Sequence, residues 1–196
     1  MKKRTIGLFF ILISILTGTA FGQQTTEDIR SLLEERDQQI KELVGPEGTS
    51  YSEEQRAKMK EIINGIIDFE AMSKEALSVT FDTISVQQQE EFVDLFSTIV
   101  RDQSLNNLDI YRADVRYEDI SVEENTARVE TMATLKNVRT PVNYELAFKN
   151  NEWVITDMEI DDVSTAGSYN RQFQRIISQK GFDSLMESLR KRAERA

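Results

Sequence analysis

The chain has 196 residues, with 24 basic and 34 acidic side chains that give a net charge of -10 at pH 7. It contains no histidine and no cysteine, which excludes disulfides, thiol nucleophiles, histidine-dependent catalytic triads and the usual zinc and copper ligand sets. An acidic surface repels nucleic acid and anionic membranes, so we expect no nucleic-acid partner.

The amino terminus predicts an export signal. Three basic residues at positions 2–4 precede an apolar run over residues 6–16, which is too short to cross a bilayer. Ala20 and Gly22 suit signal peptidase, and the absence of cysteine closes the lipoprotein route. We therefore expect residues 1–22 to be a signal peptide and residues 23–196 to form one domain exported to the periplasm. A short membrane anchor is the alternative.

Four amphipathic segments then predict helices, each with apolar residues at a spacing of three and four. The first covers residues 26–44, and the second opens at Ser52 with an apolar face that reaches Ile67. The third covers about 69–80. The fourth starts after Ser85 and carries the strongest stripe, formed by Phe92, Leu95, Phe96, Ile99 and Val100.

From about Ala113 the apolar period changes to two and predicts antiparallel strands joined by tight turns. The expected strands are 113–122, 126–136, 141–149 and 152–161. Helices over 163–179 and 181–194 close the chain. This order predicts an α+β fold in which about six helices surround a four-stranded antiparallel meander.

Two of these strands have a readable face pattern. In the third strand, one face is apolar and consists of Val142, Tyr144, Leu146 and Phe148. In the fourth, strict alternation places Trp153 and Ile155 on one face, and Val154, Met158 and Ile160 on the other.

No motif of enzymatic chemistry stands in the chain. Its glycines after residue 22 form neither a phosphate loop nor a dinucleotide fingerprint nor a nucleophile elbow. We expect a protein that is not an enzyme and has no cofactor.

Several short segments carry a family resemblance. Near the carboxyl end they are Trp153-Val154-Ile155-Thr156-Asp157-Met158, Asp161-Asp162-Val163-Ser164, Tyr169-Asn170-Arg171-Gln172-Phe173 and Gly181-Phe182-Asp183-Ser184-Leu185. Upstream they are Asp68-Phe69-Glu70-Ala71-Met72 and the glutamine-rich entry at Gln87 to the Phe92-x-x-x-Phe96 helix. Over roughly residues 55–192 the chain resembles the MlaC, or toluene-tolerance, family of lipid-binding proteins. It departs at Asp162, where the family has glycine, and at Tyr169-Asn170, which stand in swapped order.

The resemblance implies a curved sheet wrapped by helices around an apolar cavity that holds the acyl chains of a phospholipid. It implies a shuttle that carries phospholipid between the outer and inner membranes and supports outer-membrane lipid asymmetry. The implied partners are an outer-membrane lipoprotein complex and an inner-membrane ABC transporter with lipid-binding domains. We expect a monomer.

The predicted lipid-contacting residues are the apolar side chains of these stripes, although ordinary core positions show the same pattern. For the acyl chains they are Phe69, Met72, Phe92, Phe96, Ile99, Met132, Val142, Tyr144, Leu146, Phe148, Met158, Ile160 and Phe173. At the mouth of the cavity, near the headgroup, they are Tyr169 and Arg171. A surface ion pair is the alternative for Arg171.

Four other hypotheses remain open from the residues. A cone-shaped α+β enzyme acting on an apolar substrate would need a carboxylate beside a tyrosine, for which Asp157 and Tyr144 are the candidates. A structural adaptor of the cell envelope would have a filled interior. Glu159, Asp161 and Asp162 are candidates for a hard-cation site or for a solvated strand end. The basic residues at 190–195 serve either docking or a helix dipole.

Overall fold

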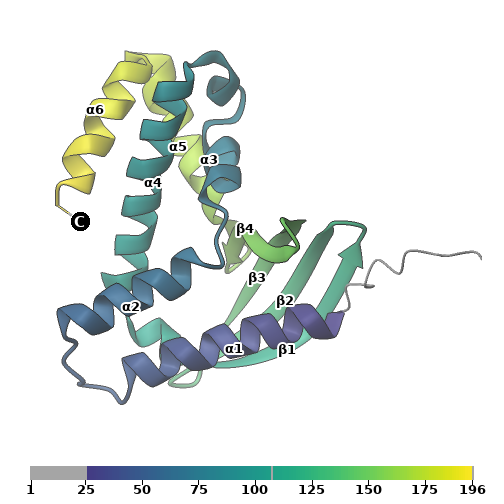
Figure 1. Cartoon of the computed structure of the whole chain (residues 1–196). Coiled ribbons are helices and arrows are strands. Elements are labelled where there is room, and N and C mark those ends of the chain that lie inside the picture. The colour runs from purple at the N-terminus through teal and green to yellow at the C-terminus, as the bar shows by residue number, and fades with distance from the viewer. Residues whose placement is uncertain (1–25, 107, 196) are drawn as a thin grey trace, which may run out of the picture.

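The structure is a computed structural model that describes residues 26–106 and 108–195. The predicted signal peptide, residues 1–22, lies outside them. The described chain is an α+β fold of one antiparallel sheet and six α-helices (Figure 1), which confirms the predicted class. The helices are α1 (Thr26–Val44), α2 (Glu53–Asn64), α3 (Phe69–Leu77), α4 (Val86–Asn106), α5 (Thr165–Lys180) and α6 (Phe182–Ala193), with 3-10 helices η1 (Ser78–Thr83) and η2 (Leu108–Arg112). The strands are β1 (Asp114–Glu123), β2 (Thr126–Leu135), β3 (Val138–Lys149), β4 (Glu152–Ile160) and β5 (Val163–Ser164).

Local capping sets where the helices begin. The Ser52 side chain accepts a hydrogen bond from the Gln55 backbone, and the Gln55 side chain accepts one from the Ser52 backbone, which is a complete capping box. Ser85 and Gln88 form the same pair ahead of α4. The helix starts at 53 and 86 therefore follow from the sequence.

Three helix ends differ from the prediction because the backbone is used elsewhere. Helix α2 stops at Asn64, since the backbone of Ile66 and Asp68 hydrogen-bonds to Ile155 of β4. Helix α3 stops at Leu77, where Ser78 takes a positive φ of 49° and the chain continues as η1. Helix α5 starts at Thr165 because residues 163–164 form β5, a strand that the prediction lacked.

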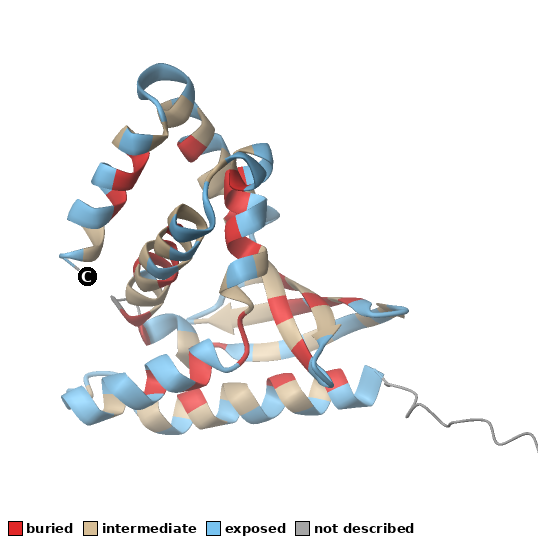
Figure 2. Cartoon of the chain, turned by 45° about the horizontal axis from the view of Figure 1, so that its top comes forward, coloured by how far each residue is buried: buried red, intermediate tan, exposed pale blue. Residues whose placement is uncertain are grey.

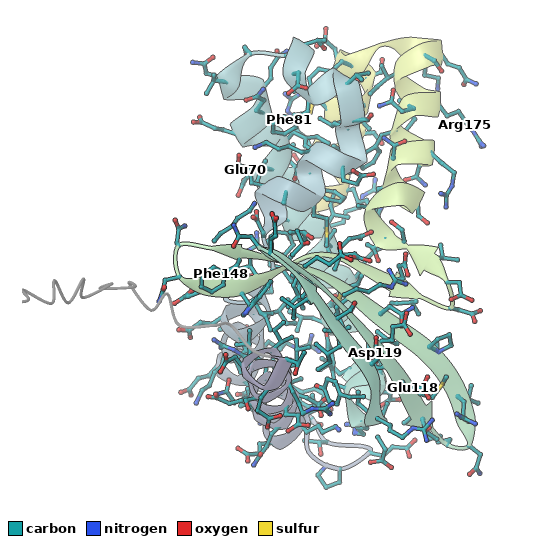
Figure 3. All side chains as sticks on the ribbon, turned by 90° about the vertical axis from the view of Figure 1, so that its right-hand side faces the viewer. Glu70, Phe81, Glu118, Asp119, Phe148 and Arg175 are labelled. Carbon is teal, nitrogen blue, oxygen red and sulfur yellow. The ribbon has the colours of Figure 1, made fainter. Side chains whose placement is uncertain are left out.

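The five strands follow chain order in an antiparallel meander with two bulges. In β1 the register shifts between Tyr117 and Asp119, so Glu118 is the extra residue, and both Glu118 and Asp119 are exposed (Figure 3). In β4 the register shifts opposite Glu145 and Leu146, which makes Thr156 the extra residue. Bulges bend a strand and increase its twist, so they contribute to the curl of this sheet.

The molecule has two parts (Figures 1 and 2). Helices α3 to α6 pack together on one side, while α1 and α2 lie with the sheet. Helix α1 runs along the sheet and contacts β1, α2 and η2. No helix in the described part of the chain is long and apolar enough to cross a membrane.

Candidate functional site

A cavity of about 120 Å³ lies between α1, the end of α2 and one face of the sheet, which we call the inner face. Its wall is mostly apolar, with three tyrosines and one residue of each charge among its members. The lining residues are Leu33, Arg36, Asp37, Ile40, Ile63, Ile66, Ile67, Ser104, Tyr111, Val115, Tyr117, Tyr144, Ile155 and Met158. A space with this lining excludes bulk water and suits an apolar ligand with few polar atoms.

Helical and strand periodicity bring these residues together. Leu33 and Ile40 lie two turns apart on α1, so both point at the sheet. Val115 and Tyr117 alternate on β1, and Tyr144 faces the same way from β3. The cavity wall is therefore the inner face of the sheet closed by the apolar stripe of α1.

The bulge at Thr156 corrects the predicted faces of the fourth strand. Met158 is paired with Tyr144 and lines the cavity together with Ile155, so it shares the inner face. Ile160, paired with Val142, lies on the same face. Strict alternation placed Met158 and Ile160 opposite Ile155, which was wrong because one inserted residue shifts the period.

The tyrosine hydroxyls of the cavity stay protonated at neutral pH. Burial raises the pKa of Tyr144 to about 12, and the negative charge of Asp37 acts in the same direction. Burial also raises the pKa of Tyr117 and of Tyr111, the latter being hydrogen-bonded with the Ser104 side chain. These phenols are therefore available as hydrogen-bond donors.

Four more predicted lipid contacts lie on the inner face. Leu146 is buried, and Phe148 packs against Trp153 with ring centroids 5.3 Å apart. Val142 and Ile160 lie farther along, toward the β4–β5 turn. Among the predicted residues, Tyr144 and Met158 contact the cavity directly. Met132 instead lies on the opposite face, paired with Arg116 and Pro141.

The structure places the other predicted apolar residues in the helical part. Phe92, Phe96 and Phe173 form one aromatic cluster between α4 and α5, with ring centroids 5.6 to 5.8 Å apart. Phe69 lies under the Arg101 guanidinium at 5.0 Å. Met72 and Ile99 are buried in α3 and α4. The structure does not bring these six side chains to the cavity wall.

The two residues predicted for the mouth of the cavity also lie in the helical part. Tyr169 packs edge-on against Phe96 at 4.9 Å, and its hydroxyl donates to Gln103. Arg171 donates to Ser168 one turn earlier in α5, at 3.0 Å. Neither residue lines the cavity.

Asp157, the carboxylate of the enzyme hypothesis, points away from the cavity. It accepts hydrogen bonds from the Ser164 hydroxyl and, at 3.0 Å, from the Ala166 backbone N–H in the first turn of α5. It thus holds the start of α5 and does not meet Tyr144. Glu159 pairs with Arg128 on the face of the sheet opposite the cavity, which we call the outer face. The described residues contain no cluster of acidic side chains able to hold a metal ion.

Most of the lining residues that the sequence reasoning missed come from α1, the end of α2 with the α2–α3 connection, and the start of β1, and the others are Ser104 of α4, Tyr111 of η2 and Ile155 of β4. The stripe of α1 was visible, but it has the same pattern as ordinary core. A second signal was the placement of tyrosine, since three of the five tyrosines in the chain converge on the cavity.

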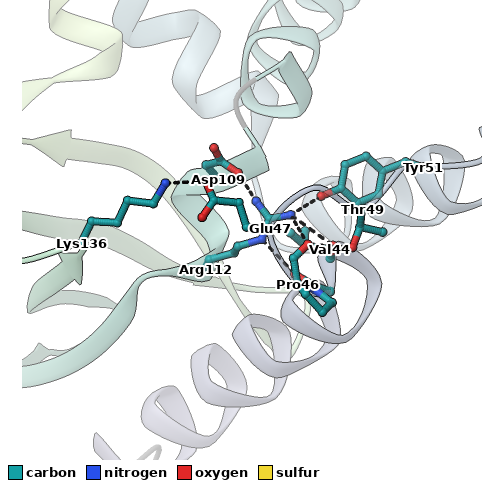
Figure 4. Close-up of polar contacts among 9 residues, drawn as sticks. Val44, Pro46, Glu47, Thr49, Tyr51, Asp109, Arg112 and Lys136 are labelled. Carbon is teal, nitrogen blue, oxygen red and sulfur yellow. Dashed lines mark hydrogen bonds and ion pairs between the residues drawn. The ribbon is translucent and has the colours of Figure 1, made fainter.

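One end of α1 is fixed by a half-buried arginine (Figure 4). The Arg112 guanidinium donates to the backbone oxygens of Gly45 at 2.9 Å and Pro46 at 3.0 Å, to the Tyr51 hydroxyl and to Asp109. Lys136 of the β2–β3 turn adds an ion pair with Glu47. The carboxyl end of α1 is therefore anchored to η2 and the sheet.

A second hollow, of about 330 Å³, opens on the outer face. It is lined by Asp114, Val115, Arg116, Met132, Thr134 and Arg139. Charged side chains and contact with solvent make it a poor shelter for apolar groups.

Comparison with known proteins identifies the family and the fold of the chain. The family model described as MlaC protein matches residues 23–191, farther toward the amino terminus than the motifs indicated. The phospholipid-binding protein from Ralstonia solanacearum, solved in complex with a phospholipid, has a TM-score of 0.72 and 17% identity over 87% of this chain and 97% of that chain. A Campylobacter jejuni protein named as an NTF2-like transpeptidase has a TM-score of 0.38 and 14% identity over 65% of this chain and 96% of that chain. No curated protein matches.

The likeness to the Ralstonia protein shows a shared fold along nearly the whole of that chain. The family model covers most of the present sequence, including α1 and every strand of the sheet. The chain therefore belongs to the MlaC family.

Proposed function

We propose that this protein carries phospholipid, with the acyl chains held between α1 and the inner face of the sheet. The observation that carries the proposal is the apolar cavity, whose wall is built from the face of the sheet and from the stripe of α1. Membership of the MlaC family supports it, as does the phospholipid bound to the Ralstonia protein of the same fold.

Transfer energetics suit such a carrier. Each methylene moved from water into an apolar cavity gains about 0.8 kcal/mol, and a bilayer offers the chains nearly the same environment. Exchange between carrier and membrane is therefore close to balanced and needs no ATP at the carrier itself.

The cavity must widen to take acyl chains. Ligand pockets usually enclose about 300–1,000 Å³, whereas this cavity encloses about 120 Å³. Because Arg112 fixes the carboxyl end of α1, we place the opening at the amino-terminal end of this helix.

We extend the proposal to the setting that the family implies. The protein acts in the periplasm after removal of residues 1–22, as one domain over 23–196. It exchanges lipid with an outer-membrane lipoprotein complex and with an inner-membrane ABC transporter that bears lipid-binding domains. Its acidic net charge limits unspecific adhesion to anionic bilayers between these partners.

Two methionines on opposite faces of the sheet provide the test. Met158→Trp fills the cavity, and Met132→Trp adds the same bulk on the outer face, so the two variants form a matched pair. We expect wild type and M132W to copurify with about one phospholipid per chain and M158W to lose most of it. Lipid is measured by solvent extraction and mass spectrometry, and folding by far-UV circular dichroism.

Absence of lipid from both wild type and M132W would overturn the carrier function. If M158W and M132W both stayed folded and lost lipid to the same extent, the ligand would lie outside this cavity.

A further inference from the structure

Two hydroxyl groups of the cavity lack a hydrogen-bond partner. Tyr117 and Tyr144 both line the cavity, and neither hydroxyl makes a hydrogen bond to any described residue. Neither is sealed in the protein interior, unlike the unpartnered Ser73 hydroxyl and Trp153 indole N–H. Both phenols thus offer a free donor to whatever enters the cavity.

The neighbouring hydroxyl groups are already engaged in hydrogen bonds. Tyr117 and Tyr144 lie on either side of β2, opposite Thr131 and Val129 respectively. The Thr131 hydroxyl donates to the Val142 carbonyl, and Tyr111 is hydrogen-bonded with Ser104. The uncharged side-chain donors left free in this region are therefore the two phenols, which lie close enough to interact electrostatically.

The local charge gives an anion no net attraction. The carboxylate of Asp37 acts on both phenols and Glu34 adds to it at Tyr117, while Lys41 pairs with Asp37 at 2.7 Å and Arg30 with Glu34 at 3.9 Å. Arg36 also lines the cavity, with its guanidinium beside Gly65 at the end of α2. A phosphate or a fatty-acid carboxylate therefore finds no unpaired cation at the two phenols, whereas an uncharged carbonyl oxygen needs none.

We propose that the Tyr117 and Tyr144 hydroxyls donate hydrogen bonds to the ester carbonyl oxygens of a diacyl phospholipid, so that the protein selects ester-linked over ether-linked lipid. The inference rests on the proposed carrier function and deepens it. A diacyl lipid has two ester carbonyls where its chains join the glycerol, and they match two donors. An ether-linked lipid has no carbonyl there and would leave both phenols unpaired in an apolar site.

The test is a competition between two lipids that differ in this linkage alone. Delipidated full-length mature protein is incubated with equal amounts of diacyl and dialkyl phosphatidylcholine of the same chain length, and bound lipid is quantified by mass spectrometry. We expect wild type to favour the diacyl lipid about tenfold, since each hydrogen bond contributes a few-fold. The Y117F/Y144F double variant should bind both lipids about equally.

Tyr111→Phe is the matched control, because this tyrosine lines the same cavity but already has a partner. It should keep the preference of wild type. Equal binding of the two lipids to wild type, or a preference that survives in the double variant, would overturn ester recognition while leaving the carrier function intact. Binding of neither lipid to wild type would overturn both proposals.

Discussion

Asp157 shows how the environment of one carboxylate decides between two functions. The enzyme hypothesis required it beside Tyr144, as in an acid–base pair, whereas the structure, with the extra residue Thr156, has it on the outer face of β4. There it accepts two hydrogen bonds at the start of α5. A carboxylate at a helix amino terminus is favoured by the free N–H groups and by the helix dipole.

We therefore expect Asp157→Ala to lower the free energy of unfolding by about 1–2 kcal/mol, because Ala166 N–H and Ser164 lose their acceptor. Urea denaturation followed by circular dichroism measures it. Glu152→Ala, at the exposed start of the same strand, is the control and should change stability by less than about 0.5 kcal/mol. An unchanged D157A midpoint would show that the helix start is held by other contacts.

At the scale of elements, the sequence was most informative where the determining interactions are local. Caps such as Ser52 and Ser85 set the helix starts, and the tight turns between strands set the meander. Long-range pairing was not visible: the backbone bonds from residues 66 and 68 to Ile155 end α2 early. The bulges at Glu118 and Thr156 were hidden too, because one additional residue leaves no composition signal.

The division into a helical part and a sheet part predicts how a residue of α4 should behave. Phe96 is fully buried against Phe92, Phe173 and Tyr169. Phe96→Leu leaves a small void there, so we expect a loss of about 1–2 kcal/mol in the free energy of unfolding. The ratio of lipid to protein should remain that of wild type.

Thermal or urea unfolding and lipid extraction of the same F96L preparation provide both measurements. If F96L kept the stability of wild type but lost its lipid, Phe96 would be a lipid contact, as the sequence predicted.

At the scale of the whole molecule, the predicted set of lipid contacts combined residues from two places: the core of the helical part and the inner face of the sheet. Buried stripes from α4 and from β3 look alike in sequence, because burial against protein and burial against a ligand demand the same side chains. Only the packing of α1 over the inner face distinguishes them. It brings Leu33 and Ile40 to the same cavity as Tyr144 and Met158, more than 100 positions away in the sequence, a distance over which no local pattern gives information.

Contacts between the two parts also make stability depend on pH. Asp68 lies at the start of α3, and its carboxylate accepts from Lys149 of β3 at 2.6 Å and from Ala71 N–H at 2.9 Å. Burial alone would raise the pKa of Asp68, but these hydrogen bonds prevail and lower it. The folded state therefore holds the charged form more strongly than the unfolded state does. The stabilisation is present above the ordinary aspartate pKa of about 4 and is lost as pH falls through the lower value of the folded protein.

We expect Asp68→Asn to reduce the acid dependence of stability, because asparagine keeps the helix cap but does not titrate. Between about pH 5 and pH 2, the urea midpoint of wild type should fall by more than that of D68N. If the urea midpoints of the two proteins fell in parallel as pH was lowered, the titration of Asp68 would contribute nothing to the pH dependence of stability.

The position of Trp153 has a practical consequence. Trp153 is the only tryptophan of the chain, lies two residues before Ile155 on the cavity face, and is 6% exposed beside Phe148. Its indole N–H has no hydrogen-bond partner among the described residues, so its emission is governed by the apolar packing around it. Because Trp153 and the cavity share the inner face of the sheet, we expect lipid that enters there to alter this packing, and the native fluorescence of the residue would then report loading and unloading in real time, without any attached label.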